Sequence, residues 1–454
     1  MPKDELTPPP LLDTSGLVSI FEIEPLPPPL QKPPPPPYFA PSDLAGFYPP
    51  SALLIRVGGR VIEASKGALI LADALGAVPV SLEEEVPLDV GDLAIVEGLL
   101  RGGGIRSALV IQRIEPSRAR IRERGRIGGP PQSEAARLIE RGIGRSLAAR
   151  AEGLRTIRGF FERNSFIEID TPCLVPSPGL DLHLAAFEVP GGAGDNAAGY
   201  LSTSPEYQMK RLLAGGVPRC FQLARCFRRG EAGKRHNPDF LMLEWYRAFV
   251  GVEEIMSDTE DLVRHVAQTL TGGAEITVGG SRINLNESFE RLPVGEAFER
   301  YARVPSADAI ALATGDEDRF FRTLVEEIEP RLAAEGHPIF LTEFPAPFAS
   351  LARLKPSDPR VSERFELYIG GVELCNGFGE LTDPSEQRAR FERDLASRQK
   401  SGKPTYPIDE RFLAALEEGM PPAAGNALGV DRLLAVCLGR EDIASVQAFP
   451  REWL

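Results

Sequence analysis

The sequence has no long uncharged apolar run. No stretch approaches the roughly 18 apolar residues that a membrane span requires, which excludes a transmembrane protein. The first residues, Met1–Leu11, contain no basic segment followed by an apolar run, so no secretory signal is expected. The sequence therefore predicts a cytoplasmic protein without a membrane partner.

Cysteine is scarce, and no two cysteines form a C-x-x-C pair. The five cysteines are Cys173, Cys220, Cys226, Cys375 and Cys437. Their odd number and their spacing argue against a disulfide framework and against a zinc site. Both features favour the reducing cytosol.

Positive charge is in deficit, because 51 Lys and Arg face 65 Asp and Glu, a net charge of −14. A protein that coats DNA is therefore not expected, although a local basic patch could still bind RNA. Such a patch lies between Arg113 and Arg163, where 13 arginines and six glutamates give +7. We expect mostly a helix over Ser133–Asn164 with a solvated basic face, and a docking surface for an acidic macromolecule is the alternative.

Composition divides the chain into four parts. Residues 1–50 contain 16 of the 42 prolines, which predicts a Pro-rich disordered tail or, alternatively, a docking peptide for an aromatic groove. Residues 51–116 form a small OB-like β-barrel in this interpretation, residues 117–145 an Arg-rich connector, and residues 146–454 a larger domain of irregular α+β order. The barrel strands are expected at Leu53–Ala64, Ala68–Leu71, Val78–Leu82, Leu93–Leu100 and Ala108–Ile114.

Aromatic residues are absent from Ser51 to Arg120, and eight Lys and Arg against nine Asp and Glu leave this span at −1. Proteins usually grip single-stranded nucleic acid by stacking bases on aromatic rings, each worth about 1–3 kcal/mol. The barrel is therefore predicted to be structural rather than RNA-reading.

The first of four informative segments is Ser202–Lys210. Ser204 and Pro205 are typical of a helix start, where Glu206 would complement the helix dipole. Alternatively, the Glu206 carboxylate at this helix end holds a substrate ammonium group.

The second segment, Phe221–Arg247, contains two strand-like runs around a glycine-containing loop, which predicts a long hairpin. Basic residues crowd one end of it, beside Glu231 and Glu244. They form either a solvated cluster or a polyphosphate clamp. These basic residues are Arg225, Arg228, Arg229, Lys234, Arg235 and His236.

The third segment contains Gly370-Gly371, a two-residue hairpin signal. With these glycines as the loop, Tyr368 lies opposite Glu373, and Glu366 shares their face of the hairpin. Two carboxylates on one face suit Mg²⁺ bridging phosphates, and two exposed strand glutamates are the alternative.

The fourth segment, Gly425–Leu438, leads from glycines into an apolar helix expected over Leu428–Leu438. The helix carries Asp431 and Arg432. An arginine in such surroundings must pair or meet an anion.

In this order the four segments resemble the catalytic domain of class II lysyl-tRNA synthetases, from about Leu147 to Leu454. Phe166–Pro172 resembles motif 1, Phe227–Phe240 motif 2 and Gly425–Arg432 motif 3. The strings TSPEYQMKRLL, HNPDFLMLEWYR, ELCNGFGELTD and ALGVDRL are closer still to the paralogous family of elongation factor P lysine ligases. Members of that family activate (R)-β-lysine with ATP as an adenylate and transfer it to a lysine side chain of elongation factor P.

The resemblance implies an antiparallel catalytic sheet flanked by helices, and a homodimer formed across motif 1. ATP and Mg²⁺ would be required, with Arg228 and Arg432 as the catalytic residues on the α-phosphate and the terminal phosphate. The remaining ATP-binding residues would be Arg229, Gly230, Glu231, Asn237, Glu373, Leu374 and Gly429, and Glu366 and Glu373 would hold the metal. The lysine or β-lysine substrate would contact Ser204, Pro205, Glu206, Glu244, Tyr246, Asn376, Glu380 and Ala427.

Two features depart from the ligase pattern. Gly230 stands where motif 2 usually has an acid, with Glu231 one place later, and a barrel precedes the catalytic domain. The barrel keeps a lysyl-tRNA synthetase as the alternative, and an inactive binding paralogue is a third hypothesis. Ala427 favours the ligase, because the tRNA synthetases tend to have Gly there. We therefore expect elongation factor P rather than tRNA as the acceptor.

Overall fold

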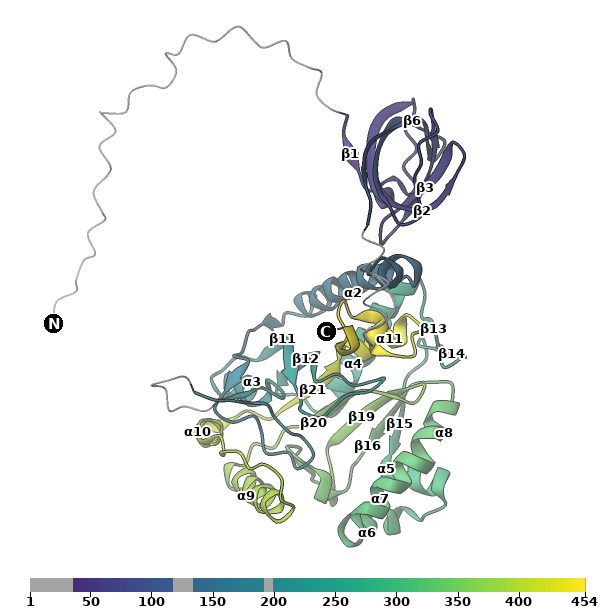
Figure 1. Cartoon of the computed structure of the whole chain (residues 1–454). Coiled ribbons are helices and arrows are strands. Elements are labelled where there is room, and N and C mark those ends of the chain that lie inside the picture. The colour runs from purple at the N-terminus through teal and green to yellow at the C-terminus, as the bar shows by residue number, and fades with distance from the viewer. Residues whose placement is uncertain (1–35, 117–133, 192–198, 454) are drawn as a thin grey trace, which may run out of the picture. The chain divides into compact units, whose positions relative to one another are not determined.

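The computed structural model describes residues 36–116, 134–191 and 199–453, and it divides into two units, residues 1–116 and 117–454 (Figure 1). Each unit has its own buried core. Two predicted segments lie partly outside the described residues. These are the tail predicted over residues 1–50, for its residues 1–35, and the connector predicted over residues 117–145, for its residues 117–133.

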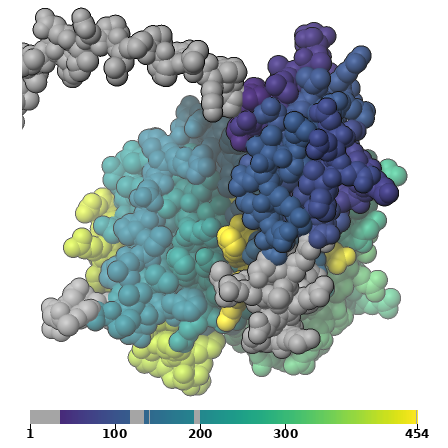
Figure 2. All heavy atoms as spheres, turned by 45° about the horizontal axis from the view of Figure 1, so that its top comes forward, coloured from purple at the N-terminus to yellow at the C-terminus, as the bar shows by residue number. Residues whose placement is uncertain are grey.

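The first unit is a closed five-stranded barrel with one short additional strand. Its strands pair in the order β2-β3-β4-β6-β5, and β5 pairs again with β2, which closes the ring. Alternate apolar side chains such as Ile55, Val57 and Val96 fill the interior. The predicted five-stranded barrel is confirmed, and its atoms form one closely packed body (Figure 2). The strands are β1 Tyr38–Phe39, β2 Leu53–Ser65, β3 Ala68–Ala72, β4 Ala77–Leu82, β5 Leu93–Arg101 and β6 Gly104–Ile114.

The segment just before the barrel folds onto it. β1 pairs with β2, and the 3-10 turn Pro41–Leu44 places Leu44 in the barrel core. The predicted boundary at residue 50 is therefore wrong for this segment, because apolar side chains among the prolines find a surface to pack on.

This segment also supplies aromatic side chains to the barrel unit. Tyr38 is 57% exposed and Tyr48 is 72% exposed, and the rings of Phe39 and Phe47 stack with centroids 6.3 Å apart. The absence of aromatic rings therefore holds for the five barrel strands but not for the whole unit.

The second unit is built on an eight-stranded sheet in the order β15-β16-β19-β20-β21-β12-β11-β7. The six strands from β16 to β11 are antiparallel to their neighbours, and the edge pairs β15–β16 and β11–β7 are parallel. The predicted antiparallel sheet is confirmed, with a parallel pair added at each edge. The strands are β7 Ile167–Glu168, β11 Arg219–Phe227, β12 Asp239–Ala248, β15 Glu290–Pro293, β16 Ile339–Thr342, β19 Arg364–Ile369, β20 Val372–Gly379 and β21 Ala423–Gly429.

Short strands form three further small sheets in this unit. These strands are β8 Leu174–Val175, β9 Glu188–Val189, β10 Gly199–Leu201, β13 Glu275–Val278, β14 Ser281–Asn284, β17 Leu354–Lys355 and β18 Asp358–Ser362.

Helices flank the eight-stranded sheet in three groups. α2, α4 and α11 share the largest core with it, α3 and α10 share a second core, and α5 to α8 lie together over a third core near β15 and β16 (Figure 1). This arrangement is the predicted α+β class. The helices are α2 Ile143–Arg163, α3 Glu206–Ala214, α4 Val252–Thr271, α5 Val294–Ala297, α6 Ser306–Gly315, α7 Glu317–Thr323, α8 Glu329–Ala334, α9 Pro384–Lys400, α10 Glu410–Gly419 and α11 Val430–Cys437.

Both predicted hairpins form. β11 pairs with β12 along its whole length, and in the second hairpin Tyr368 lies opposite Glu373 as predicted. Gly370 and Gly371 make the turn with φ of +56° and +71°, values that favour glycine. A register shift after Leu367 brings Asn376 opposite Glu366.

Two helices begin later than predicted. The helix expected over Ser133–Asn164 begins at Ile143, after a short π-helical turn at Ala136–Glu140 and Gly142 with φ of +73°. The last helix begins at Val430 rather than Leu428, because Ala423–Gly429 forms a sheet strand between β12 and β20.

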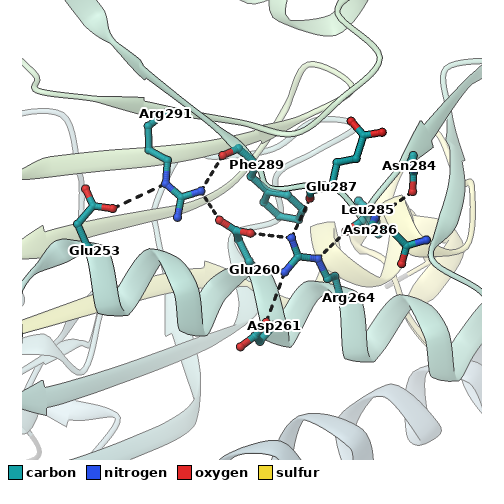
Figure 3. Close-up of polar contacts among 10 residues, drawn as sticks. All are labelled: Glu253, Glu260, Asp261, Arg264, Asn284, Leu285, Asn286, Glu287, Phe289 and Arg291. Atoms are coloured by element: carbon teal, nitrogen blue, oxygen red, sulfur yellow. Dashed lines mark hydrogen bonds and ion pairs between the residues drawn. The ribbon is translucent and has the colours of Figure 1, made fainter.

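An ion pair attaches α4 to β15, and hydrogen bonds attach it to the chain before that strand (Figure 3). Glu260 is 6% exposed and pairs with Arg264 at 2.6 Å and with Arg291. The Arg264 guanidinium also donates to the backbone oxygens of Leu285 at 2.5 Å and Glu287 at 2.8 Å. These contacts stabilise the helix against the sheet edge.

Within the described ranges, no helix combines the length and the apolar character needed to cross a membrane.

Candidate active site

A cavity of about 680 Å³ lies in the second unit, over the strands at the centre of the sheet. Its size suits a nucleotide together with a small substrate. Because β12, β21, β20 and β19 are neighbours in the sheet, residues from distant segments meet there. The predicted site residues that line it are Ser204, Glu206, Arg228, Glu231, Asn237, Glu244, Tyr246, Glu366, Glu373, Leu374, Asn376, Glu380, Ala427, Gly429 and Arg432.

Three predicted site residues do not line the cavity. Pro205 precedes α3, and Arg229 is exposed, with its backbone N–H donating to the Ala185 oxygen at 2.7 Å. Gly230 is exposed with φ of +91°, a backbone conformation that favours glycine. This turn explains why an acid is absent at Gly230, and Glu231, one residue later, reaches the cavity.

One end of the cavity carries the Arg228 guanidinium. Its Nε donates to the Thr203 backbone oxygen at 3.4 Å, and its Nη1 lies 4.0 Å from Glu231 Oε2. The guanidinium also lies over the Phe240 ring, 5.1 Å from the centroid. These long contacts leave Arg228 with donors free to meet an anion.

Arg432 joins three segments at the same end. Its Nη1 donates to the Glu373 backbone oxygen at 2.8 Å, and its Nε donates to the Arg235 oxygen at 3.1 Å. Its Nη2 lies 2.7 Å from His236 Nε2. Because arginine only donates, this histidine nitrogen accepts, which requires a neutral ring. Burial and the neighbouring Arg432 lower the pKa of His236, which favours that neutral form.

Glu366 and Glu373 face the cavity from the second hairpin. Glu366 accepts hydrogen bonds from Arg364 at 2.7 Å and from the Tyr368 hydroxyl at 3.0 Å. Burial and the Glu373 charge raise its pKa to about 7, against the opposing effect of Arg364. This repulsion is what a bound divalent cation would relieve. No group of three or more His, Cys, Asp or Glu that could hold a metal occurs among the described residues.

The opposite end of the cavity is lined by buried carboxylates. Glu244 is fully buried and accepts hydrogen bonds from the Ser204 hydroxyl at 2.6 Å and the Tyr246 hydroxyl at 3.1 Å. Burial and the nearby Glu206 raise the pKa of Glu244 to about 8. Burial also raises the pKa of Glu380, to about 7. Such carboxylates are suited to binding an ammonium group.

The floor of this end is made by residues without long side chains. Ala427 lies opposite Glu244 on one side and Asn376 on the other. A Cβ at Gly425 would lie 2.2 Å from Tyr246 and 3.0 Å from Glu380, so the glycine permits these two side chains to approach the strand.

Comparisons with known proteins show the family of the chain. Residues 132–453 match the family model of class II tRNA synthetases (D, K and N). The elongation factor P–(R)-β-lysine ligase of Proteus mirabilis is 42% identical over 325 residues, which cover 67% of this chain and 94% of the relative. The ligases of Edwardsiella ictaluri and Haemophilus influenzae are each 42% identical, over 326 and 316 residues, with the same coverage of both chains. The chain belongs to this class II synthetase-like ligase family.

Family membership covers the second unit, because the match to the family model begins at residue 132 and leaves the barrel outside. The cavity of this family member also contains residues to which the sequence assigned no role. Phe240 lines the cavity, and Arg364 orients Glu366. Phe240 lies at the end of motif 2 and Arg364 two residues before Glu366, and these positions were a signal for both. His236, which the sequence placed in the basic cluster of motif 2, orients Arg432.

Lys210 is a third residue without a predicted role, and it lies behind the cavity wall. Its side chain is 1% exposed, and its Nζ lies 2.5 Å from both Glu206 Oε1 and Glu380 Oε2. In the sequence it reads as the ordinary partner of Glu206 one helical turn away.

Proposed function

We propose that this enzyme uses ATP to activate (R)-β-lysine or lysine as an adenylate and then transfers it to a lysine side chain of elongation factor P. The observation that carries the proposal is that one cavity joins two arginines and a carboxylate pair at one end to buried carboxylates at the other. The first end suits a triphosphate and the second a substrate with amino groups. The names of the relatives supply the acceptor.

The first half-reaction requires no nucleophile from the enzyme. A carboxylate oxygen of the amino acid attacks the α-phosphorus of ATP, and the bond to the bridging oxygen of pyrophosphate breaks. Arg228 would hold the α-phosphate and Arg432 the terminal phosphate, so that catalysis consists of orientation and charge stabilisation. Asn237, Leu374 and Gly429 would contact the nucleotide.

Magnesium fits the first end of the cavity. Glu366 and Glu373 would hold the ion, and Mg²⁺ commonly binds through one or two carboxylates with substrate phosphates completing its shell. The ion would neutralise charge on the leaving pyrophosphate. Arg364 and Tyr368 keep the Glu366 carboxylate oriented toward the cavity.

In the second half-reaction, the neutral amine of the acceptor lysine attacks the carbonyl carbon of the adenylate. An amide bond forms, the bond from this carbon to the phosphate oxygen breaks, and AMP leaves with the electron pair. The amine loses one proton in this step. Glu206, Glu244 and Glu380 hold the amino groups of the activated substrate, so its carbonyl stays at the arginine end.

The edge strand β7 supports a homodimer formed across motif 1. Ile167 in β7 is 54% exposed, and Leu174 in the following β8 is 55% exposed. Apolar side chains at a sheet edge are suited to burial against a second copy of the chain.

Lysyl-tRNA charging is the second candidate, and the barrel unit with its exposed Tyr38 and Tyr48 favours it. One experiment separates the two functions. Pyrophosphate exchange is measured with lysine and with (R)-β-lysine, followed by transfer of the labelled amino acid to elongation factor P or to lysine tRNA. We expect exchange and transfer to elongation factor P; efficient transfer to tRNA alone would contradict the proposal.

A further inference from the structure

Lys210 does not line the cavity, yet it contacts two residues that do. It extends from α3 to Glu206, on the same helix, and to Glu380, which follows β20. Its ammonium group also lies 5.9 Å from the centroid of the Phe378 ring. Any effect of Lys210 on a substrate must therefore pass through the two carboxylates.

The cluster around Lys210 contains more negative than positive groups. Of its three carboxylates, Glu206 and Glu380 share the Lys210 ammonium group, whereas in the described part of the chain no cation pairs with Glu244. Glu380 is fully buried, and its Oε1 has no hydrogen-bond partner among the described residues. Buried charge without a partner is costly, so this end of the cavity is built to receive positive charge.

With all three carboxylates ionised, the surplus corresponds to two positive charges, because Lys210 offsets one carboxylate and two remain. Lysine and β-lysine each carry two ammonium groups, while their carboxylate belongs at the arginine end. A substrate with two amino groups would therefore complete the charge balance.

We propose that Lys210 is a positioning residue that makes the cavity selective for amino acids with two amino groups, by neutralising one carboxylate and fixing Glu206 and Glu380 around the remaining space. This inference rests on the proposed function. Burial by itself lowers the pKa of Lys210, but Glu206 and Glu380 outweigh it, so that the pKa lies above its ordinary value and the side chain stays charged.

Without the Lys210 charge, the carboxylates would repel one another and retain protons to higher pH. The groups facing the cluster are Glu206, Tyr207 and Lys210 on α3, Cys220 and Cys226 on β11, Glu244 and Tyr246 on β12, Glu380 after β20, and Arg353 beside Glu380. Of these, Arg353 alone supplies another positive charge, and it pairs with Glu363. Arg353 therefore does not replace Lys210.

The test is steady-state pyrophosphate exchange by full-length Lys210→Met, with Lys210→Arg as the charge-retaining variant. In Lys210→Met we expect the KM for lysine to rise at least tenfold at pH 7.5, while the KM for ATP stays within twofold. The pH at which the lysine KM levels off should move upward by about one unit, and Lys210→Arg should restore most of the affinity.

Arg264→Met is the matched control, because Arg264 also forms a buried pair with a glutamate one helical turn away, outside the cavity (Figure 3). It should lower stability without changing either KM. A lysine KM within threefold of wild type in Lys210→Met, or equal increases in both KM values without a shifted pH profile, would overturn the inference.

Should Lys210→Met fail to fold, binding to the wild type decides. Norleucine has the same carbon chain as lysine and one amino group, and it should bind at least 100-fold more weakly; comparable affinities would overturn the inference. Wild-type protein without exchange on lysine or β-lysine would overturn the proposed function and this inference together. Wild-type exchange that Lys210→Met leaves unchanged would overturn this inference alone.

Discussion

The charged side chains at the two ends of the cavity differ in their exposure and in how closely they are paired. At the proposed phosphate end, the side chains of Arg228 and Arg432 are 23% and 18% exposed, and their contacts are mostly long or to backbone oxygens. At the proposed amino-acid end, Lys210 and Glu380 are 1% and 0% exposed and contact each other. In the proposed function, the first end would exchange partners as ATP becomes pyrophosphate and AMP, whereas the side chains of the second end already hold one another.

This difference has an energetic consequence. A partly solvated guanidinium costs little to leave unpaired and gains strength when the site closes over phosphate. Buried carboxylates are costly to keep ionised, so burial raises the pKa of Glu244 to about 8 and that of Glu380 to about 7. The first end is therefore expected to govern rate, and the second to govern selectivity and pH dependence.

The largest expected effect is at the phosphate end. Arg228→Ala or Arg432→Ala should lower kcat for pyrophosphate exchange at least 100-fold, because the charge developing on the phosphates loses a positioned donor. Thermal unfolding should stay close to that of wild type. Arg360→Ala, an exposed arginine paired with Asp358 outside the cavity, is the control. Near-normal pyrophosphate exchange in either cavity variant would contradict the phosphate-binding roles proposed for Arg228 and Arg432.

A smaller effect should separate the carboxylates of the two ends. Glu373→Gln should raise the Mg²⁺ concentration required for half-maximal exchange about tenfold, because it removes half of the carboxylate pair. Glu380→Gln should instead raise the KM for lysine about tenfold and leave the Mg²⁺ requirement unchanged. Titrations of both components in both variants test this, and the reverse pattern would exchange the two roles.

The amino-acid end should also respond to pH. In the proposed function Glu244 and Glu380 bind an ammonium group when ionised, so the affinity for lysine should rise between pH 6 and pH 8 as these groups lose their protons. The expected change is about tenfold per pH unit for each proton released. Calorimetric titration with lysine in the absence of ATP measures this affinity without the contribution of Glu366, which is assigned to the metal site. Affinity that is constant from pH 6 to pH 8 would contradict the proposed desolvation.

In the absence of substrate, Glu244 and Glu380 should make the free energy of unfolding fall as the pH rises. Each has a folded-state pKa above its ordinary value, so its contribution to stability is complete below about pH 4.5 and is lost as pH rises through 7 to 8. The increase in melting temperature caused by lysine should therefore be greater at pH 8 than at pH 6.

Local patterns predicted much of this site. The Gly370-Gly371 turn predicted that Tyr368 lies opposite Glu373 and that Glu366 shares the face of Tyr368, because hairpin register next to the turn follows from the turn. The register shift that places Asn376 opposite Glu366 was not predictable from the turn. Lys210 was not predictable in the same way, since its second partner, Glu380, arrives through the order of strands in the sheet. Residues 38–44 were misjudged for a related reason: the surface that orders them belongs to strands later in the chain.

The smallest effect is expected from removing the barrel. The cavity is lined by second-unit residues, and the match to the family model, residues 132–453, lies outside the barrel. Deletion of residues 1–116 should leave lysine-dependent pyrophosphate exchange within threefold of the full chain. Tyr38→Ala with Tyr48→Ala in the full chain is the milder variant and should leave exchange unchanged. Exchange and transfer to elongation factor P are measured side by side with charging of lysine tRNA. Efficient tRNA charging by the full chain that is lost on deletion of residues 1–116 would show that the lysyl-tRNA synthetase alternative is correct. Its loss in the Tyr38→Ala, Tyr48→Ala variant as well would show that the exposed rings contact RNA.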